Sequence, residues 1–456
     1  MTHVAVLDIG KTNAKLALVE TETMQELAVL TRPNTVLQGP PYPHFDTEAL
    51  WAFFLAALRE VHAAHGVDRI TVTTHGACFV LLGAGGGMAC PVLDYEHDGP
   101  DSMAAAYDAL RPDFADTGSP RLPLGLNAGA QLHWLLETQT GLREATAQVV
   151  SYPQYWSGRL TGGFAAEPTS LGCHTDLWLP SEGQLSDLPD RLGLTMAPLI
   201  AAGAVAGTLT EDVARATGLP KSTPVHSGIH DSNASLLPHL RVMEGAFSVV
   251  STGTWVISMA VGGATSALDP ARDTLVNVNA LGGATPSARF MGGREYELMK
   301  GETTAPTESD RTRVLTGDLM LLPAIEAASG PFAGRRGGWS DPAMTPGEKG
   351  AALSWYLALM TAECQHLIGA RGPVVVEGPF ARNADYLAML GACTGRAVLI
   401  SASATGTSVG AALLADPQAQ PPKGRPVAPP AEAAALAAYG RAWRERTDRQ
   451  PAPQPA

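Results

Sequence analysis

The segment VAVLDIGKTNAKLALVE, near the start of the chain, places a carboxylate, a glycine and several hydrogen-bond donors around one tight turn. An apolar run reaches Asp8, the turn Gly10-Lys11-Thr12-Asn13 follows, and apolar and polar residues then alternate again, which predicts a hairpin. Because Gly10 has no Cβ, backbone N–H groups of such a turn can approach an anion, and the other three side chains add donors and charge. The turn suits a polyphosphate, and Asp8 suits Mg²⁺, which prefers oxygen ligands.

A second segment, FSVVSTGTWVISMAV, repeats this pattern beyond the midpoint of the chain. Its turn is Ser251-Thr252-Gly253-Thr254, and it has no carboxylate. Either segment alone could be an ordinary hairpin, since Gly and Asp are common in turns for conformational reasons. The repetition favours two phosphate loops that hold one nucleotide tail, with only the first recruiting metal.

The segment His230-Asp231-Ser232-Asn233 precedes the second hairpin and begins a predicted helix. Asp231 or Ser232 suits the helix cap, where a side-chain oxygen accepts backbone N–H bonds. A carboxylate at a helix N-terminus is also held ionised, so it can accept a proton from a hydroxyl group. Asp231 can therefore serve both as a cap and as the general base of a phosphoryl transfer.

Together, the motifs DIGKTN, HDSNAS and STGTW resemble those of the FGGY carbohydrate kinases, in the superfamily of actin, sugar kinases and heat-shock ATPases. The resemblance is strongest to the rhamnulokinase and fuculokinase branch, and it extends from Val4 to about Ala415. Two further segments are similar to segments of this family. One is SYPQYWSGRLTG, and the other runs from VVVEGPFARN to VGAALLA and resembles the adenosine-binding stretch.

The resemblance implies an α/β fold with two ribonuclease H-like domains that flank a nucleotide and sugar cleft. It implies Asp231 as the catalytic base and Asp8 as the carboxylate associated with Mg²⁺. The residues that it implies for binding ATP are Gly10, Lys11, Thr12 and Asn13 in the first loop, Gly253 and Thr254 in the second, and Gly378, Pro379 and Asn383 around the adenosine.

The sugar is expected to contact residues that can both accept and donate hydrogen bonds. These are His75, Gly76, Glu96, Gln154 and Asp231. An alternative for His75 and Glu96 is that they are solvated loop residues near a strand end. Three places depart from the family pattern: Glu377-Gly378-Pro379 replaces three glycines, Cys78 replaces an acidic residue, and Asp94-Tyr95-Glu96-His97 replaces an Asp-x-Arg arrangement.

The activity implied by the resemblance is ATP- and Mg²⁺-dependent phosphorylation of a small neutral ketose, such as L-rhamnulose or L-fuculose. Kinases of this family that act on a pentulose or polyol, such as xylulose, ribulose or glycerol, remain an alternative. A non-catalytic sugar sensor on the same fold is an alternative of another class. A degraded catalytic Asp or a DNA-binding segment would favour the sensor, and the sequence shows neither.

Composition favours an enzyme that acts on small molecules. The net charge is −13 and no basic cluster occurs, which argues against nucleic acid and anionic membranes as partners. The sequence shows no charged and apolar leader and no apolar span long enough to cross a bilayer, so we expect a cytoplasmic protein. A homodimer is possible from the sequence. The five cysteines form no C-x-x-C pair, which indicates reduced thiols.

The elements that position these residues follow from periodicity. Strands are predicted near Val4, Ala17, Thr71 and Val80, and helices over 48–66, 131–136, 347–370 and 431–447. The first helix ends at Gly66, as expected for a helix C-terminus. We predict an N-terminal kinase domain over 1–240, a C-terminal kinase domain over 241–440 and a partly disordered tail over 441–456.

Overall fold

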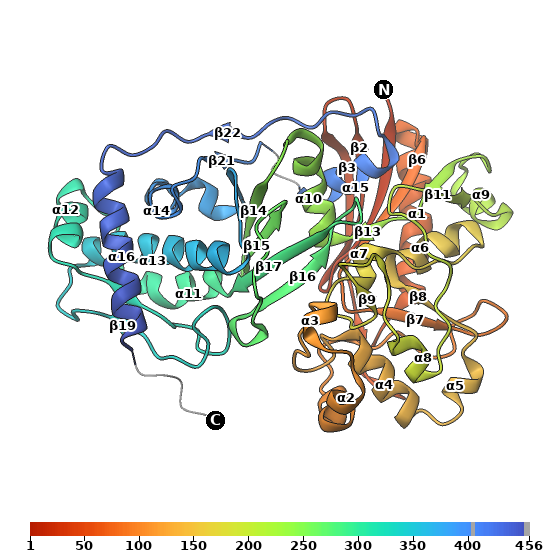
Figure 1. Ribbon diagram of the computed structural model, residues 1–456. Helices are drawn as coiled ribbons and strands as arrows, with labels where there is room; N and C mark the ends of the chain where they lie inside the picture. The colour runs from red at the N-terminus through yellow and green to blue at the C-terminus, as the bar shows by residue number, and fades with distance from the viewer. Residues whose placement is uncertain (403–405, 451–456) are drawn as a thin grey trace. The chain divides into compact units, whose positions relative to one another are not determined.

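The computed structural model describes residues 1–402 and 406–450, which form two compact units (Figure 1). Unit 1 contains Met1–Val242 and Val276–Ala284, and the chain returns to it over 406–421. Unit 2 contains Met243–Leu275, 285–402 and 422–450. The predicted domains were continuous stretches, whereas each unit combines separate segments. Of the predicted tail, residues 441–448 belong to a helix, and 451–456 lie outside the described residues.

Unit 1 is built on a mixed sheet with the strand order β11-β12-β6-β1-β2-β3, and a further short strand, β13, pairs with β6. The strands are β1 (His3–Ile9), β2 (Asn13–Glu20), β3 (Gln25–Pro33), β6 (Arg69–Thr74), β11 (Val205–Thr208), β12 (Pro224–His226) and β13 (Ile229–His230). β1 pairs antiparallel with β2 and parallel with β6, so the ends of β1 and β6 lie at the same edge of the sheet.

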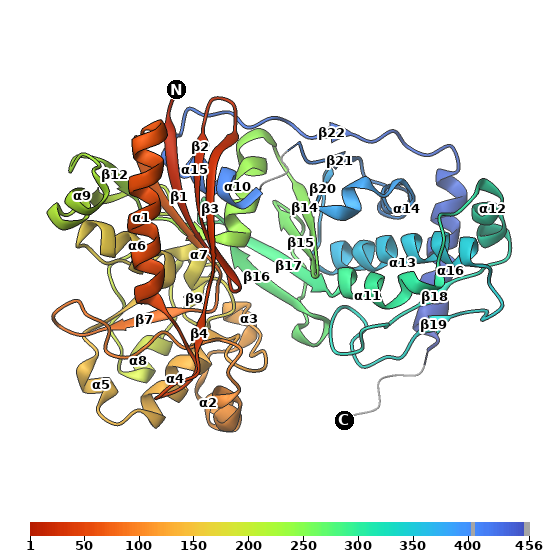
Figure 2. The same cartoon turned by 180° about the vertical axis from the view of Figure 1, so that it is seen from behind.

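Helices bury both faces of this sheet, which explains why β1 and β2 are apolar along nearly their whole length. On one face lie α1 (Thr47–His65), which runs along the sheet in Figure 2, and α6 (Tyr152–Thr161). On the other face lie α10 (Asp231–Val242) and α15 (Gly406–Ala415). The small residues of α15 pack against Val4, Val6, Ala17 and Val19 of the strands.

The other elements of unit 1 are short and mostly extend the region beyond the ends of β6 and β1. Their strands are β4 (Val36–Leu37), β5 (His44–Phe45), β7 (Phe79–Leu82), β8 (Gln148–Ser151), β9 (Trp178–Leu179) and β10 (Gln184–Leu185). Their helices are α2 (Ala104–Leu110), α3 (Phe114–Thr117), α4 (Ala128–Thr138), α5 (Leu142–Ala145), α7 (Pro168–Leu171), α8 (Leu188–Leu192) and α9 (Glu211–Thr217).

Unit 2 has its own mixed sheet, with the strand order β16-β17-β15-β14-β20-β21-β22. The strands are β14 (Phe247–Thr252), β15 (Val256–Val261), β16 (Thr274–Val278), β17 (Ala284–Phe290), β20 (Val374–Glu377), β21 (Val398–Ile400) and β22 (Arg425–Pro426), and β18 (Leu321–Leu322) and β19 (Gly338–Trp339) form a separate pair. The helices are α11 (Gly292–Met299), α12 (Glu308–Thr316), α13 (Pro346–Leu367), α14 (Ala384–Thr394) and α16 (Ala433–Asp448). α14 packs against both α13 and α16 (Figure 1).

Most elements predicted from the sequence are present. Both hairpins form, and in each one the first strand also pairs in parallel with a later strand, β6 in unit 1 and β20 in unit 2. The four predicted helices correspond to α1, α4, α13 and α16, and α1 ends at Gly66, where φ is +76°. All five cysteines lie in the described part of the chain, where none of them is in a disulfide, and Cys78, Cys173 and Cys364 are buried. Within that part, no helix has the length and apolar character needed to cross a membrane.

One close contact joins α15 to α10, the helix that begins with Asp231. A Cβ added at Gly410 would lie 1.8 Å from the carbonyl oxygen of Ala234, so only glycine fits. We expect Gly410→Ala to lower the free energy of unfolding by about 2–3 kcal/mol, because the two helices must separate. Gly391→Ala is the control, since that helix position has its nearest atom at 3.4 Å and alanine favours helix. Equal stability of the two variants in urea denaturation would contradict this close packing.

Candidate active site

The first predicted phosphate loop is a tight turn at the end of β1. The N–H of Gly10 donates to the carbonyl oxygen of Asn13 at 2.9 Å. Asn34, the residue after β3, holds this turn in place. Its backbone N–H donates to the carbonyl oxygen of Thr12 at 2.9 Å, and its Nδ2 donates to the carbonyl oxygen of Gly10 at 2.8 Å. Thr12 and Asn13 are exposed, so their donors are accessible. The sequence did not reveal the part played by Asn34, since only the folded sheet brings it to the turn.

Lys11, in the same turn, is paired with carboxylates of another loop. Its Nζ donates to Oδ1 of Asp94 and lies 3.2 Å from Oε2 of Glu96. It also lies 4.9 Å from the ring centre of Tyr95 and 5.2 Å from that of Phe45. Of the residues around this ammonium group, only Glu96 is one that the sequence predicts to bind the sugar.

Asp8 stands where β1 delivers it to the turn. Its Oδ2 lies 3.5 Å from Nζ of Lys15 and accepts a hydrogen bond from Oγ of Ser408 at 3.4 Å. Burial raises the pKa of Asp8 from 3.8 to about 6, and the negative charge of Asp231 acts in the same direction, while Lys15 opposes the rise. The effect of Asp231 on this pKa shows that the two carboxylates share one environment.

Asp231 is the first residue of α10. Its Oδ1 accepts a hydrogen bond from the N–H of Ser232 at 2.6 Å, and Nε2 of His230 lies 3.2 Å from the same oxygen. These contacts engage Oδ1 and leave Oδ2 for a substrate. The side chain of Asp231 is 34% exposed. Its partial burial disfavours the charged carboxylate and raises the pKa of Asp231. A raised pKa makes a carboxylate a better proton acceptor near neutral pH.

Two imidazoles flank Asp231 and are neutral at pH 7. Burial lowers the pKa of both His75 and His230 to about 4. Nδ1 of His75 is 2.9 Å from the carbonyl oxygen of Gly76, whereas its buried Nε2 has no partner among the described residues. The ring of His75 contacts Phe45, Tyr95 and Tyr152, with ring centres 5.1, 5.2 and 5.3 Å away. A buried nitrogen without a partner beside a set of aromatic rings is a feature expected of a ligand pocket.

The remaining residues predicted to bind the sugar have different surroundings. The side chain of Glu96, which lies near the ammonium group of Lys11, is 60% exposed. A Cβ at Gly76 would lie 2.8 Å from Nε2 of His230, so this glycine allows the histidine to approach. Gln154 is fully buried, and its amide is occupied by Ser151 and by the Ser227–Gly228 backbone. These hydrogen bonds fix the chain before β13, and the assignment of Gln154 to the sugar stays a prediction.

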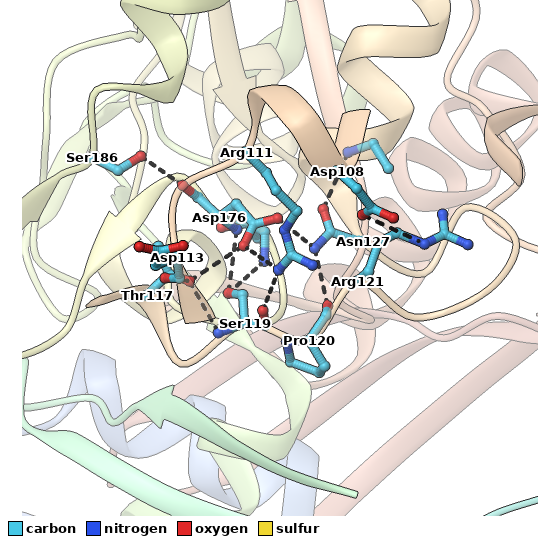
Figure 3. Close-up of polar contacts among 12 residues, drawn as sticks. Asp108, Arg111, Asp113, Thr117, Ser119, Pro120, Arg121, Asn127, Asp176 and Ser186 are labelled. Atoms are coloured by element: carbon cyan, nitrogen blue, oxygen red, sulfur yellow. Dashed lines mark hydrogen bonds and ion pairs between the residues drawn. The ribbon is translucent and has the colours of Figure 1, made fainter. Parts of the chain in front are cut away.

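A buried polar cluster surrounds Asp176 (Figure 3). Asp176 is fully buried and accepts hydrogen bonds from Tyr107 at 2.7 Å and from Arg111 and Asn127 at 2.8 Å. This fixes the turn that contains Cys173, whose Sγ lies 3.7 Å from Nε2 of His230. The cluster joins segments far apart in the sequence, and no motif indicated it.

In unit 2, the second phosphate loop and the adenosine turn are joined through Thr252. Oγ1 of Thr252 donates to the carbonyl oxygen of Glu377 at 2.5 Å and accepts from the N–H of Phe380 at 3.1 Å. Gly378 has φ +83°, and a Cβ there would lie 2.0 Å from the carbonyl oxygen of Thr252. The predicted residues Gly253 and Thr254 follow Thr252 directly and are exposed. The predicted second loop and the start of the adenosine turn therefore lie together.

Pro379 and Asn383 continue this turn into α14. Pro379 begins a 3-10 helix over Pro379–Arg382, a position that suits its fixed φ. Asn383 caps α14 by accepting from the N–H of Tyr386 at 3.1 Å, and its Nδ2 donates to Oγ of Ser354 at 3.0 Å. The side chain of Asn383 therefore orients the turn.

The raised pKa of Asp8 gives a testable link between charge and stability. Because the folded-state pKa of about 6 exceeds the ordinary 3.8, protonated Asp8 contributes stability that is fully present below pH 3.8 and is lost as the pH rises through 6. The difference between these pKa values corresponds to about 3 kcal/mol. We expect Asp8→Asn, without divalent metal, to be more stable than the wild type at pH 7 by an amount approaching this value. Urea denaturation across pH 4–7 checks it: the two proteins should converge at pH 4, and a variant no more stable at pH 7 would contradict the argument.

Comparison with known proteins agrees with this geometry. Residues 117–238 match the N-terminal domain of the FGGY family of carbohydrate kinases, and 244–423 match the FGGY carbohydrate kinase C-terminal domain. An L-fuculokinase of Salmonella typhi is 27% identical over 268 residues, 56% of each chain. A rhamnulokinase of Bacteroides thetaiotaomicron is 24% identical over 259 residues, 55% of this chain and 53% of that protein. The chain thus matches about half the length of these curated relatives.

Solved structures extend the similarity to nearly the whole chain. A carbohydrate kinase from Novosphingobium aromaticivorans has a TM-score of 0.89 at 33% identity, over 98% of this chain and 99% of that one. A xylulose kinase from Lactobacillus acidophilus has a TM-score of 0.79 at 13% identity over 98% of each chain, which shows a shared fold alone. The predicted α/β fold is confirmed. With its residues 117–238 and 244–423 matching the two family domains, the chain belongs to the FGGY family of carbohydrate kinases.

Proposed function

We propose that this protein transfers the γ-phosphoryl group of ATP to a hydroxyl group of a small neutral sugar. The observation that carries the proposal is the position of Asp231 at the first residue of α10, where contacts with described residues engage Oδ1 only and neutral imidazoles lie beside the carboxylate. Neutral histidines do not compete with the substrate as a charged partner for the carboxylate. Family membership and the two glycine-containing loops support the same reaction.

The step requires an oriented hydroxyl group and a proton acceptor. The hydroxyl oxygen bonds to the γ-phosphorus, the bond from that phosphorus to the β,γ-bridging oxygen breaks, and ADP leaves. The hydroxyl proton passes to Oδ2 of Asp231, while Oδ1 stays bonded to the N–H of Ser232 and keeps the side chain in place.

Asp8 is the residue that would hold Mg²⁺. Its carboxylate is incompletely compensated by Lys15, as its raised pKa shows, and a single oxygen ligand fits a cation that keeps most of its water and binds phosphates. Within 1–402 and 406–450, no group of three or more His, Cys, Asp or Glu side chains could hold a metal by itself. When bound, the cation would neutralise phosphate charge.

For the acceptor we propose a ketose such as L-rhamnulose or L-fuculose. Among the rings that contact His75, the half-buried ring of Tyr95 offers an apolar surface for the C–H face of a sugar, whereas Phe45 and Tyr152 are buried. Asp94, Glu96 and the open nitrogen of His75 offer polar contacts for its hydroxyl groups. The names of the matched L-fuculokinase and rhamnulokinase are in keeping with this class.

The test is sugar-dependent release of ADP from Mg·ATP, measured with a coupled assay across ketohexoses, 6-deoxyketohexoses, pentuloses and polyols. We expect one of the 6-deoxyketohexoses to give the highest kcat/KM. Highest activity with xylulose, ribulose or glycerol would support the proposed kinase activity but contradict the proposed substrate. Sugar binding in calorimetry without ADP release from any sugar would overturn the kinase in favour of a sensor.

A further inference from the structure

Lys11 lies in the turn predicted to bind phosphate, yet every contact of its ammonium group is with another part of unit 1. It donates to Asp94, lies 3.2 Å from Glu96, and stands 4.9 and 5.2 Å from the ring centres of Tyr95 and Phe45. Its side chain is 17% exposed and that of Asp94 is 10% exposed, so this pair is shielded from water. A shielded ion pair is costly to break, because each partner would be left without compensation.

The loop that receives Lys11 is itself organised around Asp94. Oδ1 of Asp94 accepts the bond from Lys11 and also one from the N–H of Glu96 at 3.2 Å. The N–H of Asp94 donates to the carbonyl oxygen of Pro43, and that of His97 donates to the carbonyl oxygen of Asp94, both at 2.9 Å. The backbone therefore fixes the loop, and Lys11 fixes the carboxylate within it.

The same aromatic rings connect Lys11 to the buried imidazole. Phe45 and Tyr95, which lie against the ammonium group, also contact the ring of His75 at 5.1 and 5.2 Å. Nε2 of His75 is the buried nitrogen without a partner described above. Lys11, Asp94 and His75 thus belong to one cluster of contacts, and the charge of Asp231 acts on His75.

We propose that Lys11 is a positioning residue for the acceptor sugar and not a ligand of the phosphates. It holds the Asp94 carboxylate in one orientation, so that this carboxylate can accept hydrogen bonds from sugar hydroxyl groups. The inference rests on the proposed function, and it assigns one residue of the first loop to the sugar instead of the nucleotide. The donors left for phosphate in this loop are the backbone N–H groups and the side chains of Thr12 and Asn13.

The test separates sugar binding from nucleotide binding in the same variant. We expect Lys11→Met to raise the KM for the best sugar of the panel at least tenfold, with the Kd of Mg·ADP in calorimetry changed less than threefold. Lys11→Arg keeps the charge and should recover part of the sugar affinity. Lys221→Met is the matched control, since that lysine is 63% exposed and pairs only with Glu211 at 3.7 Å among the described residues. A tenfold or greater rise in the Kd of Mg·ADP for Lys11→Met would overturn the inference.

A double-mutant cycle tests whether Lys11 acts through Asp94. Asp94→Asn should raise the KM for the sugar by itself, and the double variant should lose no more than the worse single variant. Fully additive losses would overturn the inference. If the wild type releases no ADP with any sugar, the proposed function fails, while the calorimetric comparison with Mg·ADP still decides whether Lys11 serves the phosphates. Thermal unfolding of each variant shows whether it is folded.

Discussion

Asp231→Asn will lower kcat by about 10²–10⁴-fold, the range that a positioned general base contributes. Asparagine has the same shape as aspartate and can still accept the hydrogen bond from Ser232 through its oxygen. It cannot take the proton of the sugar hydroxyl at Oδ2. The KM for the sugar should change much less than kcat, because the contacts of the hydroxyl groups with the rest of the pocket remain.

The measurement is ADP release at saturating Mg·ATP and sugar, with thermal unfolding to show that the variant is folded. Asp212→Asn is the matched control, since Asp212 also lies in the first turn of a helix but is 89% exposed and pairs with Arg215 at 3.1 Å. A kcat for Asp231→Asn within threefold of the wild type would remove Asp231 as the base. In the wild type, burial raises the pKa of Asp231, so kcat should fall on the acid side at a pH above the ordinary value of 3.8.

Gly378→Ala will weaken the binding of Mg·ADP at least tenfold and lower the stability of unit 2. A Cβ at this position would lie 2.0 Å from the carbonyl oxygen and 2.7 Å from Oγ1 of Thr252, and φ is +83°. The turn after β20 would have to move away from β14, which would break the two hydrogen bonds of Thr252. The combined cost of overlap and backbone strain is about 3 kcal/mol or more.

Gly395→Ala separates the two parts of this cost. Gly395 also has a positive φ, +65°, but a Cβ there meets nothing within 4 Å, so that variant carries the backbone strain alone. We expect it to lose about 1 kcal/mol in urea denaturation and to bind Mg·ADP like the wild type. If Gly378→Ala binds Mg·ADP with unchanged affinity, the proposed nucleotide turn is wrong.

Features that depend on neighbouring residues were predictable from the sequence. The two hairpins follow from short-range alternation around a glycine turn, and α1, α13 and α16 follow from runs of apolar residues with clear ends. The helix that begins at Asp231 was predicted by its capping residues. In these cases the residues that determine the structure lie within one or two turns of each other.

Features that depend on which segments meet in space were not predictable. Ser408 reaches Asp8 from a helix 400 residues later, and nothing in either segment indicates the other. A lysine in a glycine turn has the chemistry of a phosphate ligand, and no neighbouring residue in the sequence indicates the contact with Asp94 that forms in the folded chain. Gln154 has suitable hydrogen-bonding groups, and only the packing of α6 against the Ser227–Gly228 segment shows that they are already in use.

The late return of the chain to unit 1 constrains the order in which the protein can fold during synthesis. Strands β14 to β21 leave the ribosome before α15, and until then Val4, Val6, Ala17 and Val19 lack the part of their apolar cover that α15 supplies. The nascent first unit should stay protease-sensitive, and a burst of protection should come only after residue 415 has emerged. Pulse proteolysis of ribosome-bound chains stalled at residue 402 and beyond residue 450 would detect this, and equal protection of both would refute it. A segment made after most of the second unit thus completes the first unit.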